Sequence, residues 1–268
     1  MSAKMKVAFT GCSMSRGDGF DMSYLAPEIW PNIVSQVFDF DSENLGISGA
    51  SNLRIFQTAS TAILSKKYNL VFCQWTMLNR LWLSPGPNEW YFLTGDGKNS
   101  FEYRDIKLNQ REKTDLEHMI MLLNHDYQNI IELVDYIKIL EELAQSCQVK
   151  IVHVNGMVPW QPDLADENTA NDFSTMSLYT RQLLDFDKRD DEEIKKLFLE
   201  LHNKFLTLDP HRWINLFDSF QSQMVDLGPL GHHPGPRSHM IMGNLVQNYL
   251  THLALSKLRQ KFSRIDQG

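Results

Sequence analysis

The sequence predicts an α/β fold: a three-layer α/β/α sandwich built on about five parallel strands. Short apolar runs alternate with segments of helical periodicity along the chain, which is the pattern of a parallel sheet covered on both faces. One of these runs, residues 69–75, is almost continuously apolar, as central parallel strands are. In such sheets ligands bind beyond the carboxyl ends of the strands, so the segments that follow the strands are the first candidates for a site.

Five strands are expected from the sequence. In chain order they are residues 6–10, a short strand before Asn44, and residues 69–75, 149–154 and 213–217. Helices are expected where apolar residues recur at steps of three and four. They cover residues 23–38, with Pro31 at a helix start or break, and then residues 53–64, 116–143, 194–208 and 240–253.

The chain is expected to form one domain over residues 1–268, because this length can bury one large core. Two insertions interrupt the alternation of strands and helices. The first, at about 81–111, is rich in Gly, Pro, Trp and Tyr, and the second, at about 158–190, is polar and rich in aspartate. Aromatic rings in the first insertion could stack on a sugar or an aromatic substrate, or pack into a lid with its own small core. They are Trp82, Trp90, Tyr91 and Phe92.

Composition excludes several classes of protein. The 15 Phe, 8 Tyr and 6 Trp are too many apolar rings for a disordered or fibrous chain. The 26 Lys and Arg residues against 33 Asp and Glu residues give a formal net charge of −7. Nucleic-acid binding needs clustered basic residues, so we expect no nucleic-acid partner. No apolar run reaches the length of about 18 residues that a membrane helix needs, so we expect no membrane partner.

The cysteines and the first residues indicate the compartment. Cys12, Cys73 and Cys147 lie far apart and form no CxxC pair. A zinc ribbon or a disulfide framework is therefore not expected, and reduced thiols fit a cytoplasmic location. The apolar run of residues 7–9 is too short for the apolar region of a signal peptide and is expected to belong to the first strand.

A glycine-flanked segment, residues 11–19, directly follows the first expected strand. Its glycines let the backbone turn sharply and bring amide groups toward a ligand. A serine at such a turn is well placed as a nucleophile, with amides nearby for an oxyanion. The alternative is an ordinary loop in which Ser13 or Ser15 caps a helix. A phosphate-binding loop is disfavoured, because GxxxxGK[ST] is absent and Asp18 stands where a cation would be wanted.

Two further segments follow strands. Residues 44–55 are rich in small side chains, and the amide of Gly49 could donate to an oxyanion. Asn52 could serve simply as a helix cap. Residues 231–239 hold His232 and His233 before a Pro-Gly-Pro sequence, and imidazole is the usual base for activating a hydroxyl at neutral pH. A metal site is the alternative reading of these histidines, but no Asp, Glu or Cys stands at metal-site spacing, so no metal is expected.

Together and in this order, the three segments resemble the SGNH/GDSL hydrolase superfamily. Residues 11–17, Gly-Cys-Ser-Met-Ser-Arg-Gly, are similar to its first block, Gly-Asp-Ser-x-Thr-x-Gly. Residues 44–52 are similar to the second block, and His233-Pro234 to the His-Pro of the last. The resemblance implies a flavodoxin-like sheet, Ser13 as nucleophile and His233 as base. It also implies that the amides of Ser13 and Gly49 form the oxyanion hole.

The sequence departs from this superfamily at two places. The third block normally reads Gly-x-Asn-Asp, whose Asn is an oxyanion donor, whereas residues 74–80 read Gln-Trp-Thr-Met-Leu-Asn-Arg. Thr76 stands nearest to the position of that donor, and Asn79, Gln74 or Arg80 could replace it if the loop bends suitably. Four residues are candidates for binding substrate: Gln74, Trp75, Arg80 and Arg237.

The second departure concerns the acid that orients the catalytic histidine. The superfamily carries an Asp three residues before this histidine, and that position is Leu230 here. Asp226 is the nearest acid upstream in the same loop, and we expect its carboxylate to reach the imidazole of His233. Without such a partner the site is a Ser–His dyad, or is catalytically impaired.

The resemblance implies a serine hydrolase that cleaves an ester without a cofactor. The expected partner is a small-molecule or glycan ester, and an O-acyl group on a carbohydrate is one candidate. Two alternatives stay open. A binding protein would have kept the fold and lost the acid and the third-block Asn, and an acyltransferase would use the same site with a different acceptor.

Overall fold

The computed structural model describes most of the sheet and its covering helices. The described residues are 4–20, 25–77, 80–86, 89–95, 101–103, 111, 126–156, 203, 207–214, 220, 223–229 and 233–265. The strands are β1 (Lys6–Thr10), β2 (Asp41–Asn44), β3 (Leu70–Trp75), β4 (Arg80–Gly86), β5 (Glu89–Gly95), β6 (Phe101–Tyr103), β7 (Lys150–Asn155) and β8 (Trp213–Ile214). The helices are α1 (Ser13–Arg16), α2 (Trp30–Phe38), α3 (Asn52–Leu64), α5 (Asp126–Cys147), the 3₁₀ turn η5 (Pro210–Arg212) and α8 (Pro236–Ile265).

The main sheet is parallel and has five strands in the order β2-β1-β3-β7-β8. This confirms the predicted fold class. The order is that of flavodoxin-like doubly wound sheets, in which the chain changes direction between the first and third strands. The loops after β1 and β3 therefore diverge and leave a crevice at the carboxyl edge, which is where ligands of such sheets bind.

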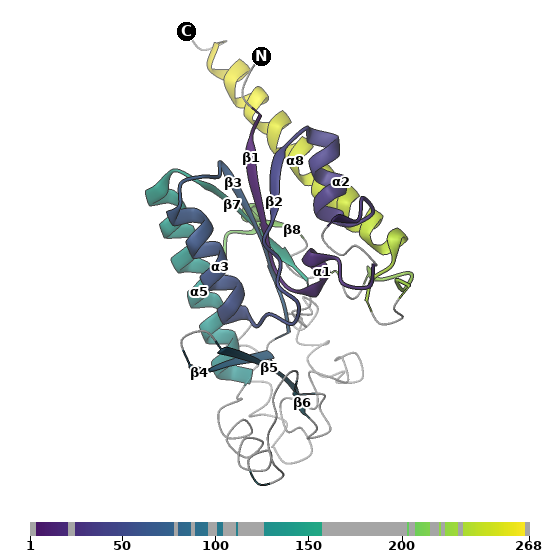
Figure 1. The fold of residues 1–268 in the computed structure, drawn as a ribbon. Helices are drawn as coiled ribbons and strands as arrows, with labels where there is room; N and C mark the ends of the chain where they lie inside the picture. Colours follow the sequence, from purple (N-terminus) through teal and green to yellow (C-terminus); the bar gives the residue numbers. More distant parts are fainter. Residues whose placement is uncertain are drawn as a thin grey trace, which may run out of the picture.

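Helices cover both faces of this sheet. Figure 1 shows α3 and α5 packed together on one face and α2 with α8 on the other. Helix α2 has Pro31 in its first turn, where the missing N–H of proline costs no hydrogen bond. Pro236 likewise begins α8. The two prolines therefore mark the amino ends of the helices that cover this face.

Aromatic packing forms the core between the sheet and α2. Phe9 of β1 and Phe72 of β3 are paired in register, and their rings stack with centroids 5.0 Å apart. Trp30 of α2 meets Phe9 edge-on at 5.2 Å. All three side chains are buried, and each buried phenylalanine contributes about 1.5–3 kcal/mol relative to exposure. This cluster holds α2 against the strands that precede the candidate site.

The observed elements differ from the expected ones mainly at their ends. Helix α2 begins at Trp30 rather than near residue 23, and α8 begins at Pro236 rather than at 240. The first insertion contains the antiparallel strands β4, β5 and β6, which the sequence analysis did not predict. The second insertion, the first part of the expected helix 116–143, most of the expected helix 194–208 and the end of the fifth strand lie outside the described residues.

Candidate active site

The turn after β1 carries Ser13 as the first residue of α1. Cys12 precedes it in an extended conformation, with φ −94° and ψ −159°. The amides of Ser15 and Arg16 donate to the carbonyl of Cys12 at 3.0 Å, and the amide of Gly17 donates to that of Ser13 at 2.9 Å. Ser13 is 4% exposed. A strand, a sharp turn and a helix thus set this serine at the carboxyl edge, as the sequence predicts.

Ser15 has a different role from Ser13. Its side chain is fully buried, and its hydroxyl donates to Gln74 Oε1 at the end of β3. A neutral carboxamide oxygen accepts a hydrogen bond but does not take up the proton at ordinary pH. The Ser15 hydroxyl is therefore a structural donor.

The second segment is tied to the first by hydrogen bonds. Asn44 Nδ2 donates to the Ser15 carbonyl at 2.7 Å, and Asn44 Oδ1 accepts from the amide of Gly46 at 3.0 Å. The amide of Ile47 donates to the carbonyl of Gly11 at 3.0 Å. These bonds hold the loop after β2 against the turn that carries Ser13.

Gly49 lies in the next turn of this loop. Its φ is +71°, a left-handed conformation that glycine adopts at little cost. The amide of Ala50 donates to the carbonyl of Ile47 at 3.1 Å, which closes the turn. The turn ends where α3 begins, and Ser51 caps that helix by accepting from the amide of Arg54 at 3.3 Å. The interpretation of Asn52 as the cap is therefore wrong.

Asn52 instead holds the loop after β3. Its Oδ1 accepts from the amide of Thr76 at 2.9 Å, and its Nδ2 donates to the carbonyl of the same residue at 3.2 Å. The amide of Thr76 is thus engaged, so an oxyanion role for this residue would fall to its hydroxyl. Asn79 lies outside the described residues, and of Arg80 the structure describes only its place at the start of β4. Sequence reasoning missed this role of Asn52, because its partner is distant in the chain.

Trp75 is directed into the layer between the sheet and α5. The side chain is fully buried, and its Nε1 donates to Nδ1 of His153 on β7 at 3.2 Å. The two rings stack with centroids 5.9 Å apart. The expectation that Trp75 contacts a substrate is not supported by this placement, because its one polar atom is used inside the fold.

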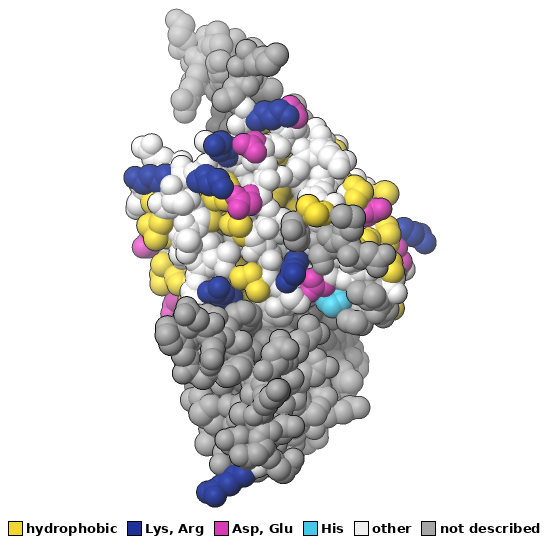
Figure 2. Space-filling model, in the orientation of Figure 1, with side chains coloured by type: hydrophobic (Ala, Val, Ile, Leu, Met, Phe, Trp, Pro, Cys, Tyr) yellow, Lys and Arg dark blue, Asp and Glu magenta, His cyan; other side chains and the backbone are white. Residues whose placement is uncertain are grey.

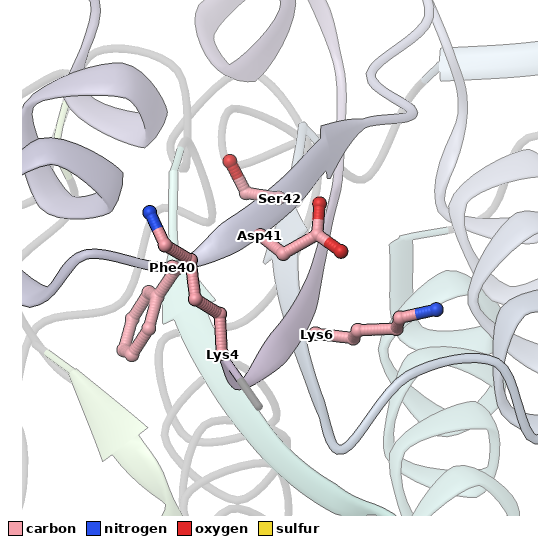
Figure 3. Close-up of a pocket in the computed structure, with 5 residues that line it drawn as sticks. All are labelled: Lys4, Lys6, Phe40, Asp41 and Ser42. Atoms are coloured by element: carbon pink, nitrogen blue, oxygen red, sulfur yellow. The ribbon is translucent and has the colours of Figure 1, made fainter. Parts of the chain in front are cut away.

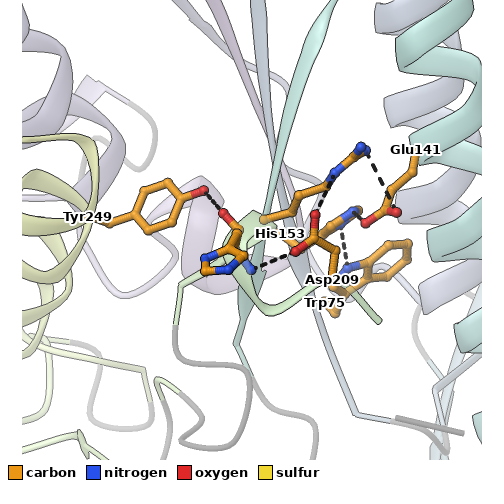
Figure 4. Close-up of polar contacts among 7 residues, drawn as sticks. Trp75, Glu141, His153, Asp209 and Tyr249 are labelled. Atoms are coloured by element: carbon orange, nitrogen blue, oxygen red, sulfur yellow. Dashed lines mark hydrogen bonds and ion pairs between the residues drawn. The ribbon is translucent and has the colours of Figure 1, made fainter. Parts of the chain in front are cut away.

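His153 is the centre of a buried polar network (Figure 4). Because Nδ1 accepts from Trp75, a neutral ring must carry its proton on Nε2, which lies 3.5 Å from Glu141 Oε1 on α5. Arg212 lies 3.7 Å from the other oxygen of Glu141 and 3.4 Å from Asp209. Burial lowers the pKa of His153, and Glu141 opposes this shift only in part. The ring is therefore neutral at pH 7 and serves to hold β3, β7 and α5 together.

His233 lies in the loop that leads into α8 and packs against the first segment. A Cβ added to Gly19 would lie 2.9 Å from the Cβ of His233. The carbonyl of His233 accepts from the amide of Gly228 at 2.8 Å, and Pro234 forms an isolated bridge with Leu227. The loop of the candidate base is thus seated on the loop that follows the candidate nucleophile. His232 and Leu230 lie outside the described residues.

Asp226 is bonded to the amino end of α8. Its Oδ1 accepts from the amide of Ser238 at 2.8 Å and from the Ser238 hydroxyl at 2.5 Å, and its Oδ2 accepts from the amide of Arg237 at 2.9 Å. Burial alone would raise the pKa of Asp226, but the hydrogen bonds from Ser238 and Arg237 outweigh it and lower the pKa. Both oxygens already have partners on α8, so an additional bond to His233 stays a prediction. The side chain of Arg237 is exposed.

His239 follows in the first turn of α8 and is fully buried. Its Nδ1 accepts from the amide of Trp30 at the start of α2 at 3.2 Å, and its ring lies 5.5 Å from the rings of both Phe20 and Phe220. Burial lowers the pKa of His239 to about 4, with His233 adding to the shift and Asp226 opposing it. This third histidine of the motif is therefore a neutral structural group at pH 7.

Two oppositely charged side chains lie close together near the turn that carries Ser13. Arg16 and Asp18 lie 3.5 Å apart, at the end of α1. On the face drawn in Figure 2, basic side chains stand beside acidic ones. Two ion pairs elsewhere in the described residues are Lys4–Asp39 and Lys67–Glu43. Exposed pairs of this kind add little stability.

The hollow drawn in Figure 3 is separate from these segments. It has a volume of about 600 Å³ and is lined by Lys4, Lys6, Phe40, Asp41 and Ser42. Lys6 and Asp41 are the first residues of β1 and β2, so the hollow lies at the amino ends of these strands. Ser13 lies at the carboxyl edge, so this hollow is not part of the candidate site.

Two kinds of feature are absent from the described residues. Among them, no group of three or more His, Cys, Asp or Glu side chains is placed to hold a metal ion. Within the same residues, no helix combines the length and the apolar character needed to cross a membrane.

Comparison with known proteins finds similarity in structure only. No family model matches this sequence, and no curated protein matches it. A protein assigned to the G-D-S-L lipolytic family from Desulfitobacterium hafniense is similar at 11% identity and a TM-score of 0.46, over 92% of this chain and 99% of that one. The psychrotrophic esterase EstA from a Pseudoalteromonas species is similar at 10% identity and a TM-score of 0.43, over 93% and 98%. The acetyl xylan esterase Est2A from Butyrivibrio proteoclasticus is similar at 11% identity and a TM-score of 0.44, over 95% of this chain and 66% of that one.

Proposed function

We propose that this chain is a serine hydrolase that cleaves esters, with Ser13 as nucleophile and His233 as general base. One observation supports the proposal most directly. The loop of His233 is seated against Gly19, in the segment that follows Ser13, at the carboxyl edge beside the crevice of the sheet. Ser15, the other serine of the segment, has its hydroxyl bonded to Gln74, which favours Ser13 as the nucleophile.

The reaction follows from these roles. Ser13 Oγ attacks the acyl carbonyl carbon as His233 takes the hydroxyl proton, and the carbonyl oxygen becomes an oxyanion. The amides of Ser13 and Gly49 donate to this oxygen, and removing one donor of such a site typically costs on the order of 10²-fold or more in kcat. The intermediate collapses, and His233 returns the proton to the departing alcohol. Water then repeats the attack on the acyl-enzyme and releases the acid.

Further oxyanion donors belong to the loop after β3. The hydroxyl of Thr76 and the side chain of Asn79 are the candidates that we retain, because the amide of Thr76 is bonded to Asn52. Arg80 and Arg237 stay candidates for binding the rest of the substrate, whereas the expectation that Gln74 binds it is not supported, because that side chain is fully buried and bonded to Ser15. An O-acyl group on a carbohydrate is the substrate that we propose, because the aromatic residues of the first insertion suit stacking on a sugar.

Reaction with a fluorophosphonate tests the proposal, since such probes label activated serines. We expect one adduct by intact mass, and we expect Ser13→Ala to abolish it with little change in Tm. Ser65→Ala is the matched control, because Ser65 is a serine at the end of α3 whose hydroxyl donates to the carbonyl of Ala62 and accepts from the amide of Lys67, both close to it in the chain. Labelling that survives Ser13→Ala would make the assignment of the nucleophile wrong.

A binding protein with the same fold is the second candidate function. One observation favours it: both carboxylate oxygens of Asp226 are bonded to α8, so the acid of a triad is not assured. A chain that no fluorophosphonate labels, but that binds an acylated sugar in a calorimeter, would support this function. Transfer of the acyl group to an added alcohol instead of water would identify an acyltransferase.

A further inference from the structure

The side chain of Gln74 fills a slot between two glycines at the carboxyl edge of the sheet. A Cβ added to Gly11, after β1, would lie 2.9 Å from the Cβ of Gln74. A Cβ added to Gly156, after β7, would lie 2.8 Å from its Cγ. Gln74 is fully buried. The two glycines therefore leave the space that this one polar side chain occupies, and a larger residue at either position would displace it.

The two ends of the Gln74 amide are used differently. Oε1 accepts from the hydroxyl of Ser15, and this bond passes so close to Gly11 that a Cβ there would lie 2.3 Å from Ser15 Oγ. Among the described residues, Nε2 is buried and has no hydrogen-bond partner. An unsatisfied buried donor costs about 1–3 kcal/mol, a cost that an apolar side chain of the same shape would avoid. A polar group kept at such a cost needs an explanation beyond packing.

We infer that Gln74 is a positioning residue for the nucleophile: through Ser15 it fixes the rotation of the short helix that begins at Ser13. This inference rests on the proposed function. Helix α1 has only four residues, and the side chain of its N-cap residue Cys12 makes no capping hydrogen bond to it, so its own backbone bonds hold it weakly. Ser15 lies in the same turn as Ser13, so any rotation that breaks the bond to Gln74 also moves Ser13 Oγ. Misplacement of a reacting atom by about 1 Å can cost on the order of 10²-fold in rate.

Three variants separate this role from packing. Gln74→Met keeps the size and removes the amide, Gln74→Glu keeps an oxygen that accepts from Ser15, and Ser15→Ala removes the donor. Thr10→Val is the matched control. It removes another buried bond between β1 and β3, from Thr10 Oγ1 to the carbonyl of Phe72 at 3.1 Å, without touching α1.

The first measurement is the second-order rate of fluorophosphonate labelling at Ser13. We expect Gln74→Met and Ser15→Ala to lower this rate by about tenfold or more each, and the double variant to be no slower than either one. Gln74→Glu should recover most of the rate, and Thr10→Val should lower Tm while leaving the rate unchanged. Wild-type rates in Gln74→Met, or independent effects in the double variant, would overturn the inference.

The second measurement does not depend on activity. Amide hydrogen exchange at Ser15, Arg16 and Gly17 reports how firmly α1 is held, since their amides form its turns. We expect exchange at these amides to be at least about tenfold faster in Gln74→Met than in Thr10→Val. If the wild-type chain is not labelled at all, the proposed function fails and this exchange still tests whether Gln74 holds α1. Unchanged exchange would overturn the inference on its own.

Discussion

At the scale of single residues, the polar side chains around the candidate site differ in what they bond. Asn52 holds the backbone of the loop after β3, Ser15 is bonded to Gln74, and Asp226 is bonded to the first turn of α8. Ser15 and Asp226 hold backbone close in the chain to Ser13 and His233, and Asn52 holds the backbone of Thr76. The partners lie far apart in the chain, by 24 residues for Asn52 and Thr76 and by 59 for Ser15 and Gln74. No local pattern in the sequence could have predicted such pairs.

Asp226→Asn tests whether the carboxylate serves α8, His233 or both. We expect Tm to fall by an amount equivalent to about 1 kcal/mol, because the amide loses one acceptor and the charge at a helix N-terminus. Because the folded pKa of Asp226 is lowered, its contribution is present above the ordinary pKa of an aspartate and is lost as pH falls through the folded value. Thermal unfolding at pH 7 and at pH 3 should therefore show a larger difference from wild type at pH 7.

The labelling rate of Ser13 in the same variant measures the catalytic role. With both oxygens bonded to α8, we expect a change within a few-fold. A fall on the order of 10⁴-fold, as for loss of a triad acid, would instead support the prediction that Asp226 orients His233. Asp209→Asn is the control, since Asp209 caps η5 by accepting from the amide of His211 at 3.0 Å.

At the scale of helices and strands, the sequence-based prediction is most accurate for the most buried elements. The expected strands 69–75 and 149–154 are observed within one residue at each end, because a central parallel strand reads as a nearly continuous apolar run. The start of α2 was predicted too early, since apolar residues such as Leu25 and Ile29 continue the helical spacing into a loop. Strand β4 and its partners were missed because Gly and Pro in that segment favour turns.

The hydrogen bond from Trp75 to His153 joins β3 to β7. The substitution His153→Phe tests how much this bond contributes to stability. We expect the free energy of unfolding to fall by about 1–3 kcal/mol, because Trp75 Nε1 then has no acceptor in a buried layer. Trp75→Phe combined with His153→Phe should cost less than the sum of the two single changes, since the indole donor that His153→Phe alone leaves unpaired is then absent. Urea unfolding of the four proteins measures this, and strictly additive effects would contradict it.

At the scale of the whole molecule, one histidine joins α2 to α8, the two helices that cover one face of the sheet. His239, from α8, accepts the first amide of α2, although the two residues are 209 positions apart in the chain. Asp226 accepts hydrogen bonds from the same turn of α8, and the loop of His233 leads into that turn. Helix α8 therefore also positions the candidate base near the crevice. A neutral imidazole therefore acts together with the aromatic cluster of Phe9, Trp30 and Phe72 in holding this face.

Acid should weaken the molecule through this group. The folded pKa of His239 is about 4, against an ordinary value of 6.5, so between these limits the unfolded chain binds more protons than the folded one. The contribution is complete above pH 6.5 and is lost as pH falls toward 4, up to about 3 kcal/mol. His239→Gln, which retains an acceptor for Trp30 and does not titrate, should flatten the rise of unfolding free energy over this range in urea titrations. His211→Gln, at an exposed position, should keep the wild-type slope, and equal slopes in all three proteins would show that His239 does not govern the acid transition.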